Sequence, residues 1–127
     1  DMVLTFRNVH NWAKAGSAEA MFTGFAKALK PGGILGLVEH RAKVGTPLEK
    51  QIKSGYMTED YVVQMAKNAG FRLDAKSEIN ANPNDTANHP KGVWNLLPGL
   101  RGVADNDKAN IISIGESDRM TLRFIKK

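Results

Sequence analysis

Apolar and polar residues follow one another along the chain in blocks that predict strands and helices in turn. Two short and almost wholly apolar runs, Met2–Phe6 and residues 34–38, are typical of strands covered on both faces in a parallel sheet. Between them, a polar turn region at residues 7–16 precedes apolar side chains that recur at helical spacing in residues 17–30. This order of strand, helix and strand predicts a right-handed crossover between parallel strands.

The second half of the chain predicts one more long helix and two more strands. Thr58 is placed to cap a helix that Gly70 ends, and the apolar segment at residues 71–79 then predicts a third strand. Residues 119–125 alternate between apolar and polar side chains, as antiparallel strands do. We therefore expect the order first, second, fourth and third strand, with the last one inserted antiparallel between its two neighbours.

Polar segments rich in glycine, proline and asparagine predict the connections. Residues 39–57 are expected to form a long loop with a short helix at residues 48–52. Residues 80–90 and 99–107 are expected to be loops, and residues 92–97 are expected to form one helical turn.

Composition narrows the class of protein. The 127 residues carry 18 Lys and Arg against 13 Asp and Glu, a net charge of +5, and no cysteine. The absence of cysteine excludes disulfides and thiolate chemistry. The basic residues are scattered rather than concentrated on one element, so nucleic acid is not the expected partner. No apolar run is long enough to span a bilayer, and we expect a soluble protein, in the cytoplasm rather than exported.

The start of the sequence predicts a missing upstream part. Asp1 leads directly into the apolar run Met2–Phe6, without an initiator methionine, a turn or a helix cap. We expect residues 1–127 to be the carboxyl-terminal part of a single domain.

Chemically versatile side chains follow the first two predicted strands. Arg7, Asn8, His10, Asn11 and Trp12 come directly after the first strand. Ligands bind at the carboxyl ends of parallel strands in open α/β sheets, so these side chains are candidates for a small-molecule site. The alternative is that the polar groups satisfy turn backbone and that the indole packs under the helix.

Glu39, His40 and Arg41 occupy the equivalent position after the second strand, so the two clusters are expected to share one crevice. A carboxylate at the end of an apolar strand needs a partner, which could be Arg7, Arg41 or an amine of a ligand. A purely structural ion pair is the alternative.

Other motifs point to no further chemistry. The glycines at 32, 33 and 36 follow a helix and open a strand, which is the reverse of a phosphate-binding loop. Asp85 and His89 could share a metal ion, but they provide only two ligands, so no metal site is predicted.

Five segments together are similar to the carboxyl-terminal half of class I S-adenosylmethionine-dependent methyltransferases, in particular the bacterial predicted methyltransferases. They are residues 1–12, 28–35, 38–40, 56–58 and 69–71, and the resemblance covers essentially the whole chain. It implies the rear half of a doubly wound, Rossmann-like sheet, with two parallel strands and a carboxyl-terminal antiparallel hairpin. It also implies that the glycine-rich cofactor loop and the acidic residue that holds the ribose lie upstream of Asp1.

The resemblance implies methyl transfer from S-adenosylmethionine to a small-molecule acceptor, with activity that requires the upstream residues. His10 is the candidate base, because an imidazole exchanges a proton near neutrality. The implied set is Thr5, Phe6, Arg7 and Asn8 for the cofactor, His10, Asn11 and Arg7 for catalysis, and Trp12, Glu39, His40 and Tyr56 for the substrate.

Two alternatives remain open at this point. The chain could be half of a nicotinamide-dependent enzyme of the same fold, or a partner-binding module without catalysis. An unpaired apolar edge at Met2–Phe6 would favour a homodimer, or aggregation, of the chain by itself.

Overall fold

A mixed sheet of four strands forms the centre of the structure, a computed structural model that describes residues 1–127. The strands are β1 (Met2–Phe6), β2 (Ile34–His40), β3 (Phe71–Ser77) and β4 (Arg119–Lys126), in the spatial order β1-β2-β4-β3. β1 is parallel to β2, and β4 is antiparallel to both of its neighbours. The predicted α/β class and strand order are confirmed. The Rossmann-like half sheet goes beyond these four strands and stays a prediction.

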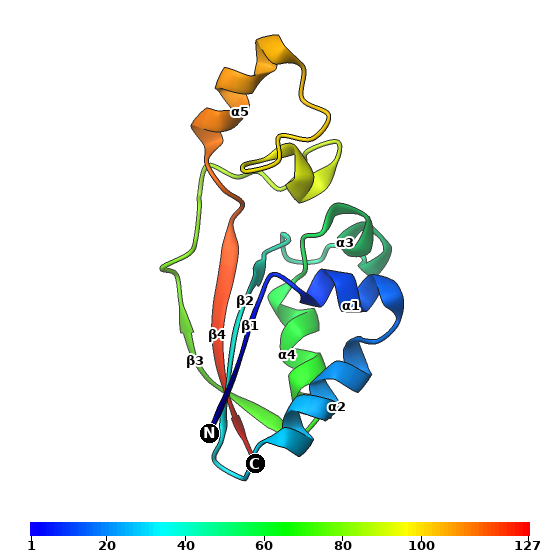
Figure 1. Cartoon of the computed structure of the whole chain (residues 1–127), viewed down its shortest axis with the longest axis vertical. Coiled ribbons are helices and arrows are strands. Elements are labelled where there is room, and N and C mark those ends of the chain that lie inside the picture. The colour runs from blue at the N-terminus through cyan, green and yellow to red at the C-terminus, as the bar shows by residue number, and fades with distance from the viewer.

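Five helices accompany this sheet, and three of them lie beside it on one side (Figure 1). The five helices are α1 (Val9–Ala15), α2 (Ala18–Ala28), α3 (Leu48–Ser54), α4 (Glu59–Asn68) and α5 (Lys108–Ile114), with short 3-10 turns η1 (Gly92–Asn95) and η2 (Asp105–Asp107). Figure 1 shows α1, α2 and α4 beside the sheet, whereas η1 and α5 lie beyond the ends of the strands. None of the helices is long and apolar enough to cross a membrane.

The main core lies between the sheet and the three helices beside it. Alternate residues of each strand point to this side, as the two-residue period of a strand requires. The buried side chains come from β2 (Leu35, Leu37), β3 (Phe71), β4 (Met120, Leu122, Phe124), α1 (Val9), α2 (Phe22, Ala26) and α4 (Val62, Ala66). Burial of this apolar surface fixes the register of β4, because a slip by one residue would turn its apolar side chains to solvent.

The other face of the sheet is open, and the prediction that β1 and β2 are covered on both faces is wrong. Met2, Leu4 and Phe6 remain 58, 58 and 55% exposed. With residues of β2, β3 and β4, they line a largely apolar groove of about 350 Å³. A continuous apolar run predicted full cover, but here only alternate residues of these strands meet the helices.

Two helices lie where none was predicted. α1 replaces the expected turn after β1: it buries Val9 and His10, leaves most of its polar side chains outward, and ends at Gly16 in the left-handed conformation (φ 73°). α5 follows the expected loop and buries no residue. The other differences are small, since β2 continues to His40 and β3 stops at Ser77. Thr58 caps α4 as predicted, accepting the Tyr61 N–H at 3.1 Å.

Candidate active site

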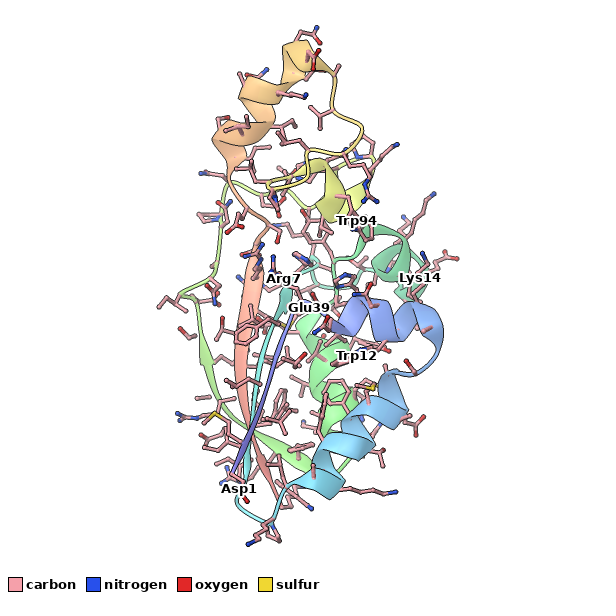
Figure 2. The ribbon with its side chains drawn as sticks, viewed as in Figure 1. Asp1, Arg7, Trp12, Lys14, Glu39 and Trp94 are labelled. Atoms are coloured by element: carbon pink, nitrogen blue, oxygen red, sulfur yellow. The ribbon has the colours of Figure 1, made fainter.

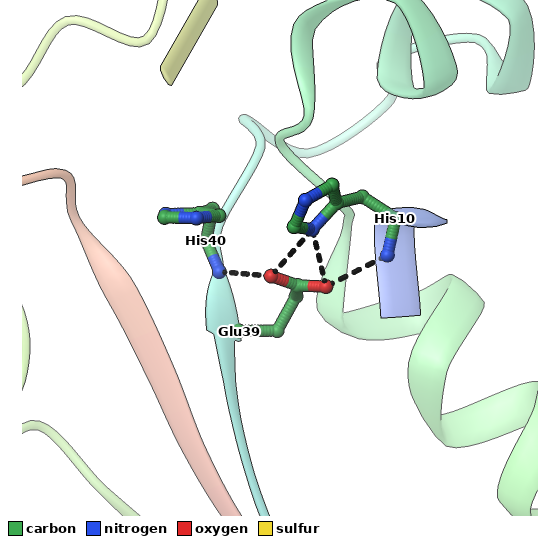
Figure 3. A group of neighbouring side chains, drawn as sticks. All are labelled: His10, Glu39 and His40. Atoms are coloured by element: carbon green, nitrogen blue, oxygen red, sulfur yellow. Dashed lines mark hydrogen bonds and ion pairs between the residues drawn. The ribbon is translucent and has the colours of Figure 1, made fainter. Parts of the chain in front are cut away.

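A buried carboxylate joins the two predicted clusters. Glu39 lies on the helix-facing side of β2, in phase with Leu35 and Leu37, and it is fully buried. Its Oε2 accepts the backbone N–H of His10 at 2.8 Å, and its Oε1 accepts the backbone N–H of His40 at 2.8 Å. The Nδ1 atom of the His10 ring lies 3.0 Å from Oε2 and 3.1 Å from Oε1 (Figure 3). Glu39 therefore fixes both the start of α1 and the ring of His10.

This contact decides which nitrogen of His10 can act as a base. A carboxylate oxygen only accepts hydrogen bonds, so the neutral imidazole beside it carries its proton on Nδ1. The lone pair is then on Nε2, the nitrogen that makes no protein hydrogen bond. The arrangement is that of a carboxylate-oriented histidine, in which the carboxylate also stabilises the imidazolium that forms on proton uptake.

His40 lies on the other side of Glu39 and stays neutral. Its ring centroid is 5.3 Å from that of His10. Burial, together with the nearby His10, Arg119 and Arg7, lowers the pKa of His40 to about 3. Its Nδ1 contacts the Ser117 hydroxyl, which also accepts the Arg119 Nε–H at 3.1 Å. A hydroxyl donates as well as accepts, and when it donates to Nδ1 the proton of neutral His40 lies on Nε2.

The two histidines open on a cavity of about 390 Å³ at the carboxyl ends of β1 and β2. Its polar lining includes three arginines and the side chain of Asn8, and its apolar lining comes mainly from the loop around η1. The residues are Phe6, Arg7, Asn8, His10, His40, Val93, Trp94, Leu96, Leu97, Pro98, Gly99, Arg101 and Arg119. Figure 2 shows Arg7, Glu39 and Trp94 at this end of the sheet. A small molecule here would meet hydrogen-bond donors, one base and an indole.

The predicted cofactor residues lie together at the end of β1. Phe6, Arg7 and Asn8 line the cavity, whereas Thr5 is buried and accepts a hydrogen bond from the Asn8 amide at 3.4 Å. Arg7 has a left-handed backbone (φ 58°), and its N–H donates to the Val38 carbonyl at 2.7 Å. The turn that ends β1 thus carries these side chains.

Besides Thr5 and Glu39, which lie behind the cavity wall, three predicted site residues lie outside the cavity. Trp12 packs against Phe22 and Phe25 at ring distances of 6.3 and 5.5 Å, which matches the alternative that its indole packs under the helix. Asn11 is on the exposed side of α1. Tyr56 is buried on the far side of His40, at a ring distance of 6.2 Å, and faces a second, lysine-rimmed hollow instead.

Tyr56 belongs to a cluster that anchors the loop over the cavity. Its hydroxyl donates to Asp85 at 2.7 Å, and burial with this hydrogen bond raises its pKa. Asp85 also accepts the backbone N–H groups of Ala87 and Asp118, and lies 2.8 Å from the His89 ring. Burial opposes the charge on Asp85, but these hydrogen bonds outweigh it and lower its pKa. Each oxygen of Asp85 already has two protein partners, so we assign Asp85 and His89 to the loop structure.

Arg41 forms a separate network and does not pair with Glu39. Its guanidinium makes two parallel hydrogen bonds of 2.9 Å to Asp118 and reaches Glu59 at 2.9 Å and Glu78 at 2.9 Å. These bonds raise the pKa of Arg41 against the opposing effect of burial. The prediction that Arg7 or Arg41 partners Glu39 is wrong, because α1 brings His10 to the carboxylate instead.

Three side chains of the site, one carboxylate and two imidazoles, also form a candidate metal site. His10, Glu39 and His40 offer ligand atoms within 4.8 Å of one another, and nitrogen with carboxylate oxygen suits zinc or iron. However, both oxygens of Glu39 already accept hydrogen bonds, and Arg7 and Arg119 make the surroundings positive. The arrangement therefore suits an anion better than a cation.

Trp94, Arg101, Arg119 and Ser117 are site residues that were not predicted. They lie 50 to 80 positions beyond the first two strands, in or next to segments predicted as a helical turn, a loop or a strand end. Their one signal in the sequence is an indole and an arginine among glycines and prolines, which is typical of a loop over a site.

No protein-family model matches the chain. No curated protein matches it either. Its function is therefore inferred from the site.

Proposed function

We propose that the chain takes part in methyl transfer from S-adenosylmethionine to a small-molecule acceptor, with His10 as the base. The observation that carries the proposal is the buried His10 and Glu39 pair, which opens on a cavity at the carboxyl ends of two parallel strands. A base in this position can take the proton of a hydroxyl, amine or thiol as that atom becomes a nucleophile.

In this proposal, each residue of the site has a separate role. Glu39 orients the ring of His10 and stabilises its charged form after proton uptake. His40, held neutral, offers an Nε2–H donor to the acceptor. Trp94 and Leu96 exclude water from one wall, which strengthens each polar contact inside the cavity.

The residues at the end of β1 fit one end of the cofactor. Arg7 and Asn8 supply donors for a carboxylate, and Phe6 supplies an apolar surface, all on the cavity wall. When bound, S-adenosylmethionine supplies an electrophilic methyl group. On this proposal, the groups that hold its adenosine belong to residues upstream of Asp1, in line with the resemblance described above.

The test uses protein expressed from the complete reading frame. Calorimetry should detect binding of S-adenosylmethionine, and mass spectrometry should detect S-adenosylhomocysteine and a methylated product with at least one compound from a panel of hydroxy, amino and thiol acceptors. Binding of a nicotinamide cofactor in place of S-adenosylmethionine, or no S-adenosylmethionine binding, would reject the proposal.

A partner-binding module without catalysis is a second candidate, because the sheet leaves one apolar face open. Met2, Leu4 and Phe6 form an exposed stripe along β1, and apolar stripes of this kind mark protein contacts. If this candidate held, Leu4→Lys would abolish function while His10→Ala would leave it unchanged.

A further inference from the structure

The arginines of the chain are distributed unevenly between carboxylates and the cavity. Arg41, Arg72 and Arg123 each pair with a carboxylate within 3.5 Å. In contrast, Arg7 and Arg101 make no ion pair, and both line the cavity. The two arginines that have no carboxylate partner therefore both line the cavity.

Arg119 adds a third positive charge from a less exposed position. Its side chain is only 14% exposed, and it reaches the exposed Glu116 at 3.4 Å and the Ser117 hydroxyl at 3.1 Å. No aspartate or glutamate lines the cavity, since Glu39 lies behind the His10 ring. Burial is the main cause of the low pKa of His40, and the positive charges of Arg119 and Arg7 lower it further. A bound anion would complement this field.

The backbone at Arg7 provides independent support. Its φ of 58° is a left-handed conformation that a side chain beyond glycine adopts at an energetic cost. Glycine would form the same turn without that cost, but it would give up the guanidinium at the cavity wall. Strained residues of this kind concentrate at ligand sites.

Most of the remaining residues of the cavity wall are aromatic or apolar, and they favour a ligand with an apolar body. Trp94 lies edge-on to the His10 ring at 6.1 Å, and Val93, Leu96 and Leu97 continue the apolar surface. A volume of about 390 Å³ accommodates a molecule of one or two rings.

From this geometry we infer that the methyl acceptor is an anion, a small aromatic or apolar compound with a carboxylate or phosphate that Arg101 and Arg119 bind, while Arg7 adds positive charge from the cofactor end of the cavity. This inference rests on the proposed function. The anionic group faces the guanidinium groups, which form charge-assisted hydrogen bonds with its oxygens. The apolar body lies against Trp94, and the nucleophile is left beside Nε2 of His10.

The experiment measures binding alone, so it needs neither the cofactor nor turnover. Protein from the complete reading frame is labelled with ¹⁵N and titrated with phenyl phosphate, benzoate, benzyl alcohol and benzylamine. The readout is the indole N–H resonance of Trp94, one of two tryptophans in residues 1–127, assigned with Trp94→Phe. Phenyl phosphate and benzoate should bind about tenfold or more tightly than benzyl alcohol, and benzylamine should bind most weakly.

Substitutions test whether Arg101 and Arg119 cause the preference for anionic probes. Arg101→Met and Arg119→Met should each raise the Kd for phenyl phosphate by about fivefold or more. Arg123→Met is the matched control: it removes the same charge from β4, four residues from Arg119 and outside the cavity, and should change the Kd by less than about twofold. The spectrum of each variant shows whether it is folded, and Arg101 is exposed, so its removal leaves the core intact.

L-Methionine distinguishes the two possible sources of a carboxylate, the acceptor and the amino-acid end of the cofactor. If it displaced phenyl phosphate as effectively as benzoate does, the arginines would serve the cofactor and the inference would be overturned. Equal binding of the neutral and anionic probes, or equal effects of Arg119→Met and Arg123→Met, would also overturn it. Anion binding without methyl transfer by the complete protein would reject the proposed function and leave the anion site in place.

Discussion

At the residue scale, the chemistry of the site depends on the contact between His10 and Glu39. In protein from the complete reading frame, His10→Ala should lower kcat by about 100-fold or more while cofactor affinity changes little, because a base acts mainly in the transition state. Glu39→Gln should also lower kcat. The two changes together should cost little more than His10→Ala alone, since Glu39 acts through His10.

Steady-state kinetics and calorimetry check this prediction, with Lys14→Ala as the control. Lys14 lies on the exposed side of α1, away from the cavity (Figure 2). His10 would return to a structural role if the turnover of His10→Ala matched the parent at all pH values from about 6 to 9.

A second residue-scale prediction concerns stability and pH. The folded-state pKa of His40 is lowered to about 3, so below its ordinary value of 6.5 the unfolded chain binds a proton that the folded chain excludes. Stability is therefore lost as the pH falls through 6.5 towards 3. Between pH 7 and pH 5 the loss from this group is about 2 kcal/mol. The lowered pKa values of Glu59 and Asp85 act only at more acidic pH.

Urea unfolding of the parent and of His40→Gln at both pH values measures this loss. The variant should lose about 2 kcal/mol less than the parent between pH 7 and pH 5. An equal loss in both proteins would mean that His40 is protonated in the folded state.

Sequence reasoning found His10, Glu39 and His40 but not how they pair. Parallel neighbouring strands must end at one edge, so residues after each strand could be placed together. Glu39 pairs with His10 because α1 brings His10 to it. The helix α1 was not predicted, because its polar residues are typical of a turn. Ser117 and Arg119 reach the site through the position of β4, and strand alternation predicts the face of a side chain but not its neighbour across the cavity.

At the element scale, the turn at η1 depends on a close approach of two backbones. Gly92 has φ 60°, and a Cβ there would lie 2.0 Å from the Ser54 carbonyl oxygen. Gly92→Ala should destabilise the fold by about 2 kcal/mol or more and displace the loop that carries Trp94. Thermal unfolding and the Trp94 indole resonance measure the two effects.

Gly24 provides the matched control for that substitution. It lies inside α2, and a Cβ there meets nothing within 4 Å. Gly24→Ala should stabilise the protein by about 0.5 to 1 kcal/mol, because alanine favours the helix. If Gly92→Ala left the unfolding temperature unchanged or raised it, as Gly24→Ala should, the close contact at Gly92 would not exist in solution.

The strands were more predictable than the elements around them. Uninterrupted apolar runs located β1 and β2, and strict alternation located β4, because burial on a sheet imposes these periods. α5 has only seven residues and fully buries no side chain, so its few apolar residues are too short a pattern to predict a helix. The exposure of one face of the sheet could not be predicted either, because an apolar run has the same pattern whether its second face is covered or exposed.

At the scale of the whole molecule, the exposed face and edge of β1 predict self-association. β1 is the first strand of the sheet and pairs on one side only, and its outward side chains are apolar. A second copy can pair with this edge and cover the adjoining face. Light scattering should therefore show a mass that rises with protein concentration.

Leu4→Lys should shift this equilibrium to the monomer, because it places a charge in the middle of the apolar stripe. Val44→Lys is the control, since Val44 is 93% exposed in a loop outside the sheet. A parent protein that stays monomeric at every concentration would contradict the prediction, as would equal effects of both substitutions.

The position of β4 has a consequence for how the protein is made. β4 follows the other three strands along the chain, yet it lies between β2 and β3 and contributes Met120, Leu122 and Phe124 to the core. During synthesis, β1 and β2 can pair early, but β3 has no partner until residues 119–126 leave the ribosome. Until then the apolar sides of three strands are exposed. The nascent chain should thus engage chaperones up to that moment, and fold at once when β4 emerges.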